Sequence, residues 1–373
     1  MTRALLALLL ILGHVPVAAA ARRRAVQHPP AATAPVAIVT AARQAAEAAL
    51  MAGAPAVQIA MSHRGRILYS AAFGMSDRES ATAATPRSVL QVGSITKPFT
   101  AAAILRLAER GALTLDDRIE KFVPEFNPRG ATITLRHLLS HTSGVTGGPA
   151  DQYSPLTREQ SIQLINGQPL AFTPGSKYSY SNAGYRLLGY AIESITGRSF
   201  ADFVQSELAL PLGLLDTGVC GTSGLPRPDG YGVLQGKWTR IPAIDMSVPF
   251  AAGALCSTAS DLARWSHLLA TGRVMLPASY ATMTTPARLT NNTLTPYGLG
   301  MFLGKMLGQP AASHTGAIAG FQSSLVYFSE QEIAVAVIVN ASLGPAGVDA
   351  HLIALTVADA ALATQYQVAR LSP

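Results

Sequence analysis

Residues 333–339 form the run that most constrains the fold, because Ile-Ala-Val-Ala-Val-Ile-Val offers no polar side chain to water. Such a continuous apolar run is typical of a strand buried on both faces of its sheet. Further strands are predicted at residues 57–62 and 67–73, joined at Arg64 and Gly65 as a hairpin-like pair, and between residues 297 and 340. The sheet is therefore expected to draw on both ends of the chain.

The middle of the chain is predicted to be mostly helical. Apolar spacing predicts helices at residues 37–51, 135–140, 183–208 and 348–362. Strands at both ends with helices between them predict a mixed α/β (α+β) fold. We expect an antiparallel sheet made from N- and C-terminal segments and flanked by helices, with the helical region inserted and a site at their junction.

Ser94-Ile95-Thr96-Lys97 is the first of three short polar motifs. Residues three apart on a helix share a face, so the Lys97 amine is expected beside the Ser94 hydroxyl. Gly93 and the apolar run after Lys97 predict a turn feeding a helix with Ser94 at its N-terminus, where free N–H groups favour a developing oxyanion. Pro98 predicts an irregular start to this helix. An unperturbed lysine has a pKa near ~10.4, so acting as a base at neutral pH needs about 4 kcal/mol from the environment.

Tyr180-Ser181-Asn182 and His314-Thr315-Gly316 are the other two motifs. Tyr180 offers a phenol that acts as a base toward Ser94 or relays a proton to a leaving group, and Asn182 offers an amide to hold a substrate carbonyl. In isolation, Tyr180 is also typical of a packed aromatic residue. The Tyr180-Ser181-Asn182 motif is predicted in a loop that enters a helix. The His314-Thr315-Gly316 motif is predicted to precede a strand at residues 317–328 that lines the cleft.

The three motifs, together with Leu-Leu-Ser-His-Thr-Ser-Gly at residues 138–144 and a segment at residues 253–262, resemble the penicillin-recognising serine hydrolases. This family contains class C β-lactamases, D-Ala-D-Ala carboxypeptidases and related esterases. The resemblance runs from about residue 36 to the C-terminal helix. It implies a β-lactamase/transpeptidase-like fold and an acyl-enzyme formed on a serine.

The resemblance also implies a role for each matching residue. Ser94 is the expected nucleophile, and Lys97 and Tyr180 are the expected proton-transfer pair. The backbone N–H groups of Ser94 and Ala317 are expected to form the oxyanion hole. Substrate contacts are expected from Asn182, His314, Thr315 and Gly316.

His314 departs from the class C β-lactamase pattern, which has lysine there, and resembles certain D,D-peptidases. A neutral imidazole attracts a substrate carboxylate less than an ammonium does, so efficient β-lactam hydrolysis is not implied. Three functions stay open. The leading one is hydrolysis of D-Ala-D-Ala peptides, β-lactams or related amides, and carboxylester hydrolysis at the same site is the alternative. The third is non-catalytic binding of peptidoglycan or peptide, which the complete proton-transfer set disfavours.

The N-terminus is predicted to be an export signal at residues 1–21, with one early arginine, an apolar core and a small-residue cleavage site. A Pro- and Ala-rich linker at residues 22–35 and a hydrolase domain at residues 36–373 follow. This predicts a periplasmic or secreted enzyme. Three arginines at positions 22–24 oppose transfer of that flank, so an uncleaved membrane anchor is the alternative.

The remaining composition indicates few other functions. Apart from the three arginines at positions 22–24, the Lys and Arg behind the formal charge of +7 are scattered singly, which does not predict nucleic-acid binding. Cys220 and Cys256 fit one disulfide in an oxidising compartment, with two buried free thiols as the alternative. His137 and His141 are four residues apart but have no third ligand nearby in sequence, so a structural role is predicted. We expect no metal and no cofactor, and a small molecule or peptide as the only predicted partner. The oligomeric state is left open.

Overall fold

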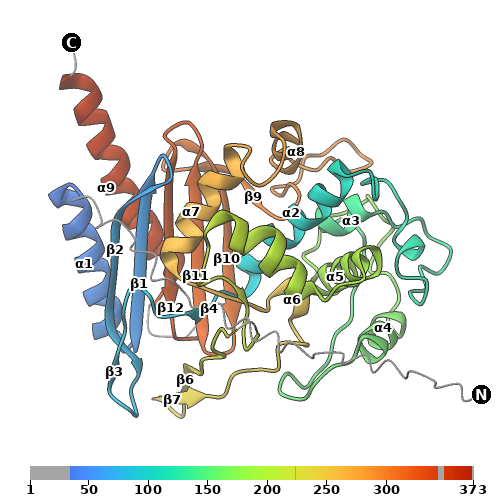
Figure 1. The fold of residues 1–373 in the computed structure, drawn as a ribbon, viewed down its shortest axis with the longest axis horizontal. Helices are drawn as coiled ribbons and strands as arrows, with labels where there is room; N and C mark the ends of the chain where they lie inside the picture. The colour runs from blue at the N-terminus through green and yellow to red at the C-terminus, as the bar shows by residue number, and fades with distance from the viewer. Residues whose placement is uncertain (1–33, 223, 343–347, 372–373) are drawn as a thin grey trace, which may run out of the picture. The chain divides into compact units, whose positions relative to one another are not determined.

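The computed structural model describes residues 34–222, 224–342 and 348–371, and its main feature is a seven-stranded antiparallel sheet (Figure 1). The spatial order of the strands is β3-β2-β1-β12-β11-β10-β9. Their bounds are β1 Ala56–His63, β2 Arg66–Asp77, β3 Thr82–Ala83, β9 Phe302–Met306, β10 Gln309–Ile318, β11 Phe321–Phe328 and β12 Ile333–Val339. Strand β1 pairs directly with β12, so the sheet joins N- and C-terminal segments as predicted.

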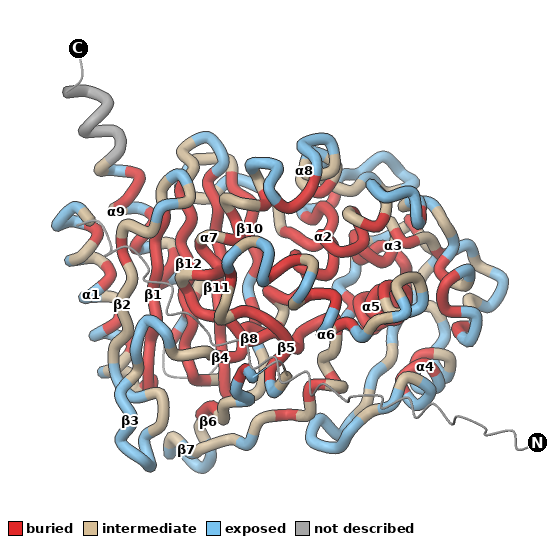
Figure 2. Tube along the Cα trace, in the orientation of Figure 1, coloured by how far each residue is buried: buried red, intermediate tan, exposed pale blue. Residues whose placement is uncertain are grey.

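The apolar run of β12 is buried on both faces of this sheet (Figure 2). Its odd-numbered residues pack in a core with α1 (Val36–Met51) and α9 (Ala350–Leu371). Its even-numbered residues from Ala334 to Ile338 pack in the larger core, which contains α7 (Ala259–Ala270). Because side chains alternate across a strand, a strand between two helical layers has to be apolar at every position.

The inserted region carries most of the remaining helices. They are α2 Thr96–Glu109, α3 Leu135–Leu139, α4 Arg158–Asn166, α5 Asn182–Thr196, α6 Phe200–Phe203 and α8 Pro277–Met283, with a π-helical turn at Val204–Ala209 and 3₁₀ turns at Gly93–Ile95, Ile119–Lys121, Leu210–Leu212 and Phe250–Ala252. Two small sheets complete the described elements: β4 (Leu90–Gln91), β8 (Leu255–Ser257) and β5 (Gly218–Val219) in one, and β6 (Gly230–Leu234) with β7 (Lys237–Ile241) in the other.

Two predicted elements were wrong in extent. The helix expected over residues 183–208 ends at Thr196, because Gly197 adopts a left-handed conformation with φ 65° and caps it. The strand expected over residues 317–328 is a hairpin, because Gly320 has φ 83° and turns the chain between β10 and β11. The His314-Thr315-Gly316 motif therefore lies inside β10 rather than before a strand.

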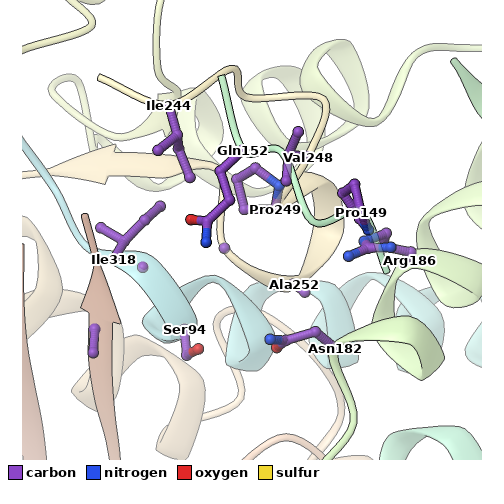
Figure 3. Close-up of a pocket in the computed structure, with 13 residues that line it drawn as sticks. Ser94, Pro149, Gln152, Asn182, Arg186, Ile244, Val248, Pro249, Ala252 and Ile318 are labelled. Atoms are coloured by element: carbon purple, nitrogen blue, oxygen red, sulfur yellow. The ribbon is translucent and has the colours of Figure 1, made fainter. Parts of the chain in front are cut away.

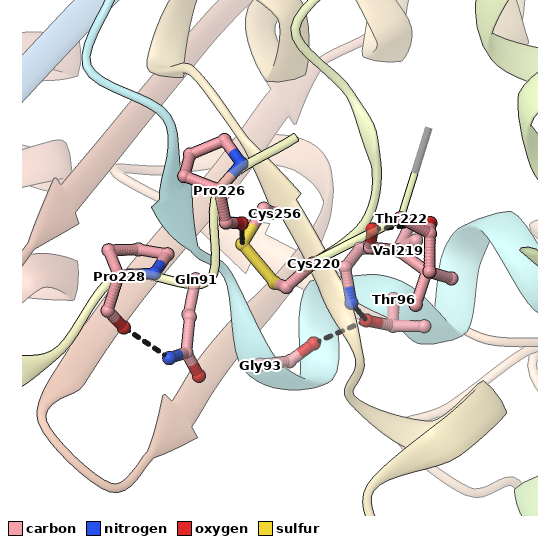
Figure 4. Close-up of a disulfide and its surroundings, with 10 residues drawn as sticks. Gln91, Gly93, Thr96, Val219, Cys220, Thr222, Pro226, Pro228 and Cys256 are labelled. Carbon is pink, nitrogen blue, oxygen red and sulfur yellow. Dashed lines mark hydrogen bonds between the residues drawn. A yellow bond between two sulfur atoms is a disulfide. The ribbon is translucent and has the colours of Figure 1, made fainter. Parts of the chain in front are cut away.

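Cys220 and Cys256 form a disulfide with their Cα atoms 5.0 Å apart (Figure 4). Cys256 lies in β8, where it pairs with Gln91 of β4 and with Gly218 of β5. The bond therefore fastens the small sheet whose strand β4 leads into the turn that carries Ser94.

The described helices include none with the length and apolar character needed to cross a bilayer. The predicted export signal, and the linker up to residue 33, lie outside the described residues.

Candidate active site

The turn that presents Ser94 is held by polar contacts on both of its sides. Ser94 lies in the 3₁₀ turn immediately before α2. The Thr96 hydroxyl donates to the Gly93 carbonyl at 2.7 Å and accepts from the backbone N–H of Leu255 at 3.0 Å. Gly93 has φ 51°, a conformation that glycine adopts without strain. The helix therefore does begin after an irregular turn, with Pro98 tolerated in its first turn.

The Lys97 amine is fully buried and surrounded by three oxygen atoms. Its Nζ lies 3.0 Å from Ser94 Oγ, 2.8 Å from Asn182 Oδ1 and 2.8 Å from the carbonyl oxygen of Ala252. The amide and carbonyl oxygens only accept hydrogen bonds. A neutral amine has two N–H bonds for these two acceptors, and its lone pair is then left for the Ser94 hydroxyl proton.

Burial lowers the pKa of Lys97 well below its ordinary value, and the nearby Arg186 guanidinium lowers this pKa further. Both effects disfavour the ammonium form. The geometry and the direction of the pKa change therefore agree that Lys97 is suited to accept the Ser94 proton.

Tyr180 is suited to donate a proton, whereas Lys97 is suited to accept one. Tyr180 is 39% exposed, and its ring centroid lies 4.7 Å from Lys97 Nζ. Burial of the hydroxyl raises the pKa of Tyr180, and a hydrogen bond with Ser94 offsets part of the rise. A phenol with a raised pKa keeps its proton at neutral pH, so the Tyr180 hydroxyl is suited to donate a proton rather than to act as a phenolate base.

His141 contacts the segment that contains Tyr180 and Asn182 and helps to fix its position. The Ser181 hydroxyl caps α5 by accepting from the backbone N–H of Gly184 at 3.1 Å and donates to the Val145 carbonyl at 2.6 Å. The His141 Nδ1 atom accepts from the backbone N–H of Ser181 at 3.0 Å, and its ring packs against Tyr180 with centroids 4.2 Å apart. His141 thus has the structural contacts expected of it.

His314 is 1% exposed and turned into the protein. Its Nδ1 lies 2.6 Å from the Thr315 carbonyl oxygen, which only accepts, so Nδ1 carries the proton. Its Nε2 lies 2.9 Å from the Tyr297 hydroxyl and accepts from it. Burial, together with the charge of Lys97, lowers the pKa of His314 to about 3. The imidazole is therefore neutral, and both of its nitrogens are already bonded.

The remainder of this motif brings strand β10 against the Ser94 turn. Thr315 is exposed, whereas Gly316 is buried. An ideal Cβ on Gly316 would lie 2.0 Å from the Val92 carbonyl oxygen, so only glycine permits this approach. The same contact places Ala317 beside Gly93, whose ideal Cβ would lie 3.2 Å from the Ala317 nitrogen. Residues 94 and 317, the expected oxyanion pair, line one pocket.

That pocket also contains residues that sequence analysis did not identify (Figure 3). Arg186 lines it beside Asn182, and Gln152 lines it from a loop joined to Asp245 by a backbone hydrogen bond of 2.9 Å. Arg186 is four residues after Asn182, a spacing that puts both on one helix face and was a usable signal. Gln152 had no such signal, because its place depends on a distant segment. Within the described ranges, no group of three His, Cys, Asp or Glu residues is arranged to share a metal ion.

The chain belongs to the beta-lactamase family, whose model matches residues 43–358. This match confirms the family predicted from the motifs. It is 30% identical over 259 residues to the putative penicillin-binding protein PbpX of Bacillus subtilis, covering 69% of this chain and 63% of that protein. It is 37% identical over 183 residues to the esterase EstB of Burkholderia gladioli, covering 44% of this chain and 46% of EstB. The chain thus spans less than two thirds of these curated relatives.

Solved structures confirm the fold. The octameric penicillin-binding protein homologue from Pyrococcus abyssi aligns with a TM-score of 0.77 at 26% identity, covering 87% of this chain and 77% of that one. The mixed fold with a large antiparallel sheet flanked by helices is therefore the β-lactamase/transpeptidase type that was predicted.

Proposed function

We propose that this chain is a serine hydrolase that forms an acyl-enzyme on Ser94. The observation that carries the proposal is the buried Lys97 amine, which lies 3.0 Å from Ser94 Oγ while two fixed acceptors use its N–H bonds. Lys97 Nζ takes the hydroxyl proton as Ser94 Oγ bonds to the acyl carbon. The backbone N–H groups of Ser94 and Ala317 stabilise the resulting oxyanion.

Tyr180 completes the proposed acylation step. Its hydroxyl gives a proton to the departing alcohol or amine and regains one from the Lys97 ammonium, so the leaving group departs neutral. Water then attacks the acyl carbon and gives a proton to neutral Lys97, which passes it to Ser94 Oγ as the acyl–oxygen bond breaks, so the acid leaves and the Ser94 hydroxyl is restored. The Asn182 side chain positions the acyl carbonyl of the substrate. The exposed Thr315 and the backbone of Gly316 lie beside the substrate along β10.

His314 favours esters and neutral amides over substrates with a carboxylate on the leaving group. Its imidazole is neutral, buried and bonded at both nitrogens, so it supplies no cation to such a carboxylate. An ester leaving group also needs less protonation than an amine. The similarity to the esterase EstB supports the same order. We therefore place carboxylester hydrolysis ahead of D-Ala-D-Ala peptide or β-lactam hydrolysis.

Two assays test this proposal on the wild type and on Ser94→Ala. The first follows hydrolysis of 4-nitrophenyl butyrate, and the second follows labelling by a fluorescent penicillin on a denaturing gel over time. Ester turnover that is lost in a folded Ser94→Ala protein is expected. Persistent Ser94-dependent labelling with little ester turnover would instead indicate a D,D-peptidase, and transient labelling would indicate a β-lactamase. If the folded wild type shows no ester turnover and no labelling, the result supports the non-catalytic alternative.

The proposal includes export of the chain. The Cys220–Cys256 disulfide supports it, because such bonds persist in oxidising compartments. Cell fractionation with N-terminal sequencing of the mature protein tests it. Cleavage near residue 20 or 21 is expected, and an intact N-terminus in the membrane fraction would favour the anchor alternative.

A further inference from the structure

Arg186 is a buried cation that no described acidic side chain pairs with. It extends from α5 one helical turn beyond Asn182 and is 5% exposed. Within the described part of the chain, its Nε and Nη1 atoms are buried and have no hydrogen-bond partner. No described acidic side chain forms an ion pair with it either. Arginine stays protonated in proteins, so this charge persists.

An unpaired buried charge is costly, and proteins normally retain one only where a partner compensates it. Even arginines that are partly exposed pair with a carboxylate here: Arg136 pairs with Asp116 at 2.8 Å, and Arg240 pairs with Asp77. Arg186 differs in that it lines the Ser94 pocket. Its missing partner is therefore expected to come from a molecule that occupies this pocket.

The Gly148 backbone packs closely on the guanidinium, because an ideal Cβ on Gly148 would lie 2.8 Å from Arg186 Nη2. Pro149, the next residue, lines the Ser94 pocket together with Arg186. Figure 3 shows Arg186 and Asn182 on one side of the pocket and Ile318 on the opposite side. Most of the other lining positions carry small or aliphatic side chains, with Ile244, Val248 and Pro249 among them. An aliphatic chain that ends in an anionic group fits such a lining.

The pocket lies on the acyl side of Ser94. It is lined by Ser94, Asn182 and Ala317, which hold the acyl carbonyl in the proposed mechanism. Tyr180, the proposed donor to the leaving group, is not among the described residues that line it. A group held by Arg186 therefore belongs to the acyl part of the substrate.

We propose that Arg186 binds a carboxylate on the acyl part of the substrate, so that this enzyme prefers half-esters or half-amides of dicarboxylic acids. The inference rests on the serine hydrolase function proposed above and names its substrate class. A guanidinium matches a carboxylate with two parallel N–H···O bonds, which gives both strength and orientation.

Paired substrates test the preference directly. The 4-nitrophenyl half-esters of succinic, glutaric and adipic acid are compared with neutral 4-nitrophenyl butanoate, pentanoate and hexanoate of equal chain length. The ratio of kcat/KM for the charged over the neutral ester is expected to exceed one for at least one pair. In Arg186→Gln this ratio is expected to fall roughly tenfold or more, as for loss of a hydrogen-bonded charge pair. Arg186→Lys keeps the charge and retains part of the ratio, and Arg129→Gln, a change at an exposed arginine, leaves the ratio unchanged.

A binding measurement keeps the inference separate from the proposed function. Titration of folded Ser94→Ala with glutarate and with pentanoate, by calorimetry, needs no turnover. Tighter binding of glutarate that disappears in Ser94→Ala/Arg186→Gln supports the carboxylate site even if no ester is hydrolysed. Ser94-dependent hydrolysis with equal rates for charged and neutral esters, and equal binding of the two acids, overturns the Arg186 inference but leaves the hydrolase function intact.

Discussion

Gly316 of β10 packs directly on the carbonyl oxygen of Val92, with room for no side chain between them. This contact joins the C-terminal part of the sheet to the turn that carries the nucleophile. The Ser323 hydroxyl donates to the same Val92 carbonyl at 2.8 Å and fixes it in place. The relative position of the two proposed oxyanion donors depends on this approach.

Gly316→Ala is therefore expected to lower kcat/KM on 4-nitrophenyl butyrate about 100-fold, because a displacement near 1 Å is enough to cost that much. Overpacking is also expected to lower the free energy of unfolding by about 1–3 kcal/mol. Steady-state kinetics and urea unfolding measure the two effects. Gly304→Ala in neighbouring β9 is the matched control, since its ideal Cβ meets no atom within 4 Å. Equal activity in both variants would contradict the proposed packing constraint.

The base assignment predicts the shape of the pH–rate profile. Neutral Lys97 is the active form, so kcat/KM for a neutral ester falls as pH drops through the pKa of Lys97. Burial and Arg186 both lower this pKa. Arg186→Gln removes one of these causes, so the acid limb is expected to move to higher pH. An unmoved limb, or one that moves to lower pH, would show that Arg186 does not act on Lys97, and Arg129→Gln serves as the charge-loss control.

His314 predicts a loss of stability in acid. Its folded-state pKa of about 3 lies below the ordinary value of 6.5. Between these values the unfolded chain binds a proton that the folded chain does not, so the free energy of unfolding falls as pH drops from 6.5 toward 3. The slope from this group is at most about 1.4 kcal/mol per pH unit. Urea unfolding between pH 4 and 7 should show a shallower slope for His314→Gln than for wild type, and identical slopes would refute the assignment.

Asp261 predicts a dependence of the opposite sign. Burial raises the pKa of Asp261 to about 6 from an ordinary 3.8, although hydrogen bonds from Asp216 and Thr217 oppose the rise. The folded chain holds this proton between pH 3.8 and 6, so its contribution to stability is complete below 3.8 and is lost as pH rises through 6. Asp261→Asn resembles the protonated form. Wild type is expected to lose stability relative to this variant between pH 4 and 7, and a constant difference across that range would show that Asp261 does not titrate there.

The disulfide is expected to contribute substantially to stability. It closes a loop between residues 36 apart in sequence, which corresponds to about 2–4 kcal/mol. Replacing Cys220 and Cys256 together by alanine should lower the free energy of unfolding by that amount. Wild type unfolded with and without a reductant provides an independent comparison. Equal stability in all of these states would mean that the bond adds nothing to the fold.

Local sequence patterns predicted much of this protein. The apolar run at residues 333–339 implied a doubly covered strand, and the structure shows helical layers on both of its faces. The spacing of Ser94 and Lys97 implied adjacent side chains, because neighbours three apart on a helix meet whatever surrounds them. The glycines at positions 197 and 320, which divide a predicted helix and a predicted strand, show where apolar spacing alone was insufficient.

The sequence by itself determined the family, the order of the main elements and the identity of the proposed nucleophile and its neighbouring amine. Only the tertiary structure decided that Lys97 faces the Ala252 carbonyl, that the buried His314 is hydrogen-bonded to Tyr297, and that Arg186 has no acidic partner among the described residues. The physical reason is that protonation state and charge pairing depend on burial and on contacts between distant segments. Periodicity within a short window carries no information about either.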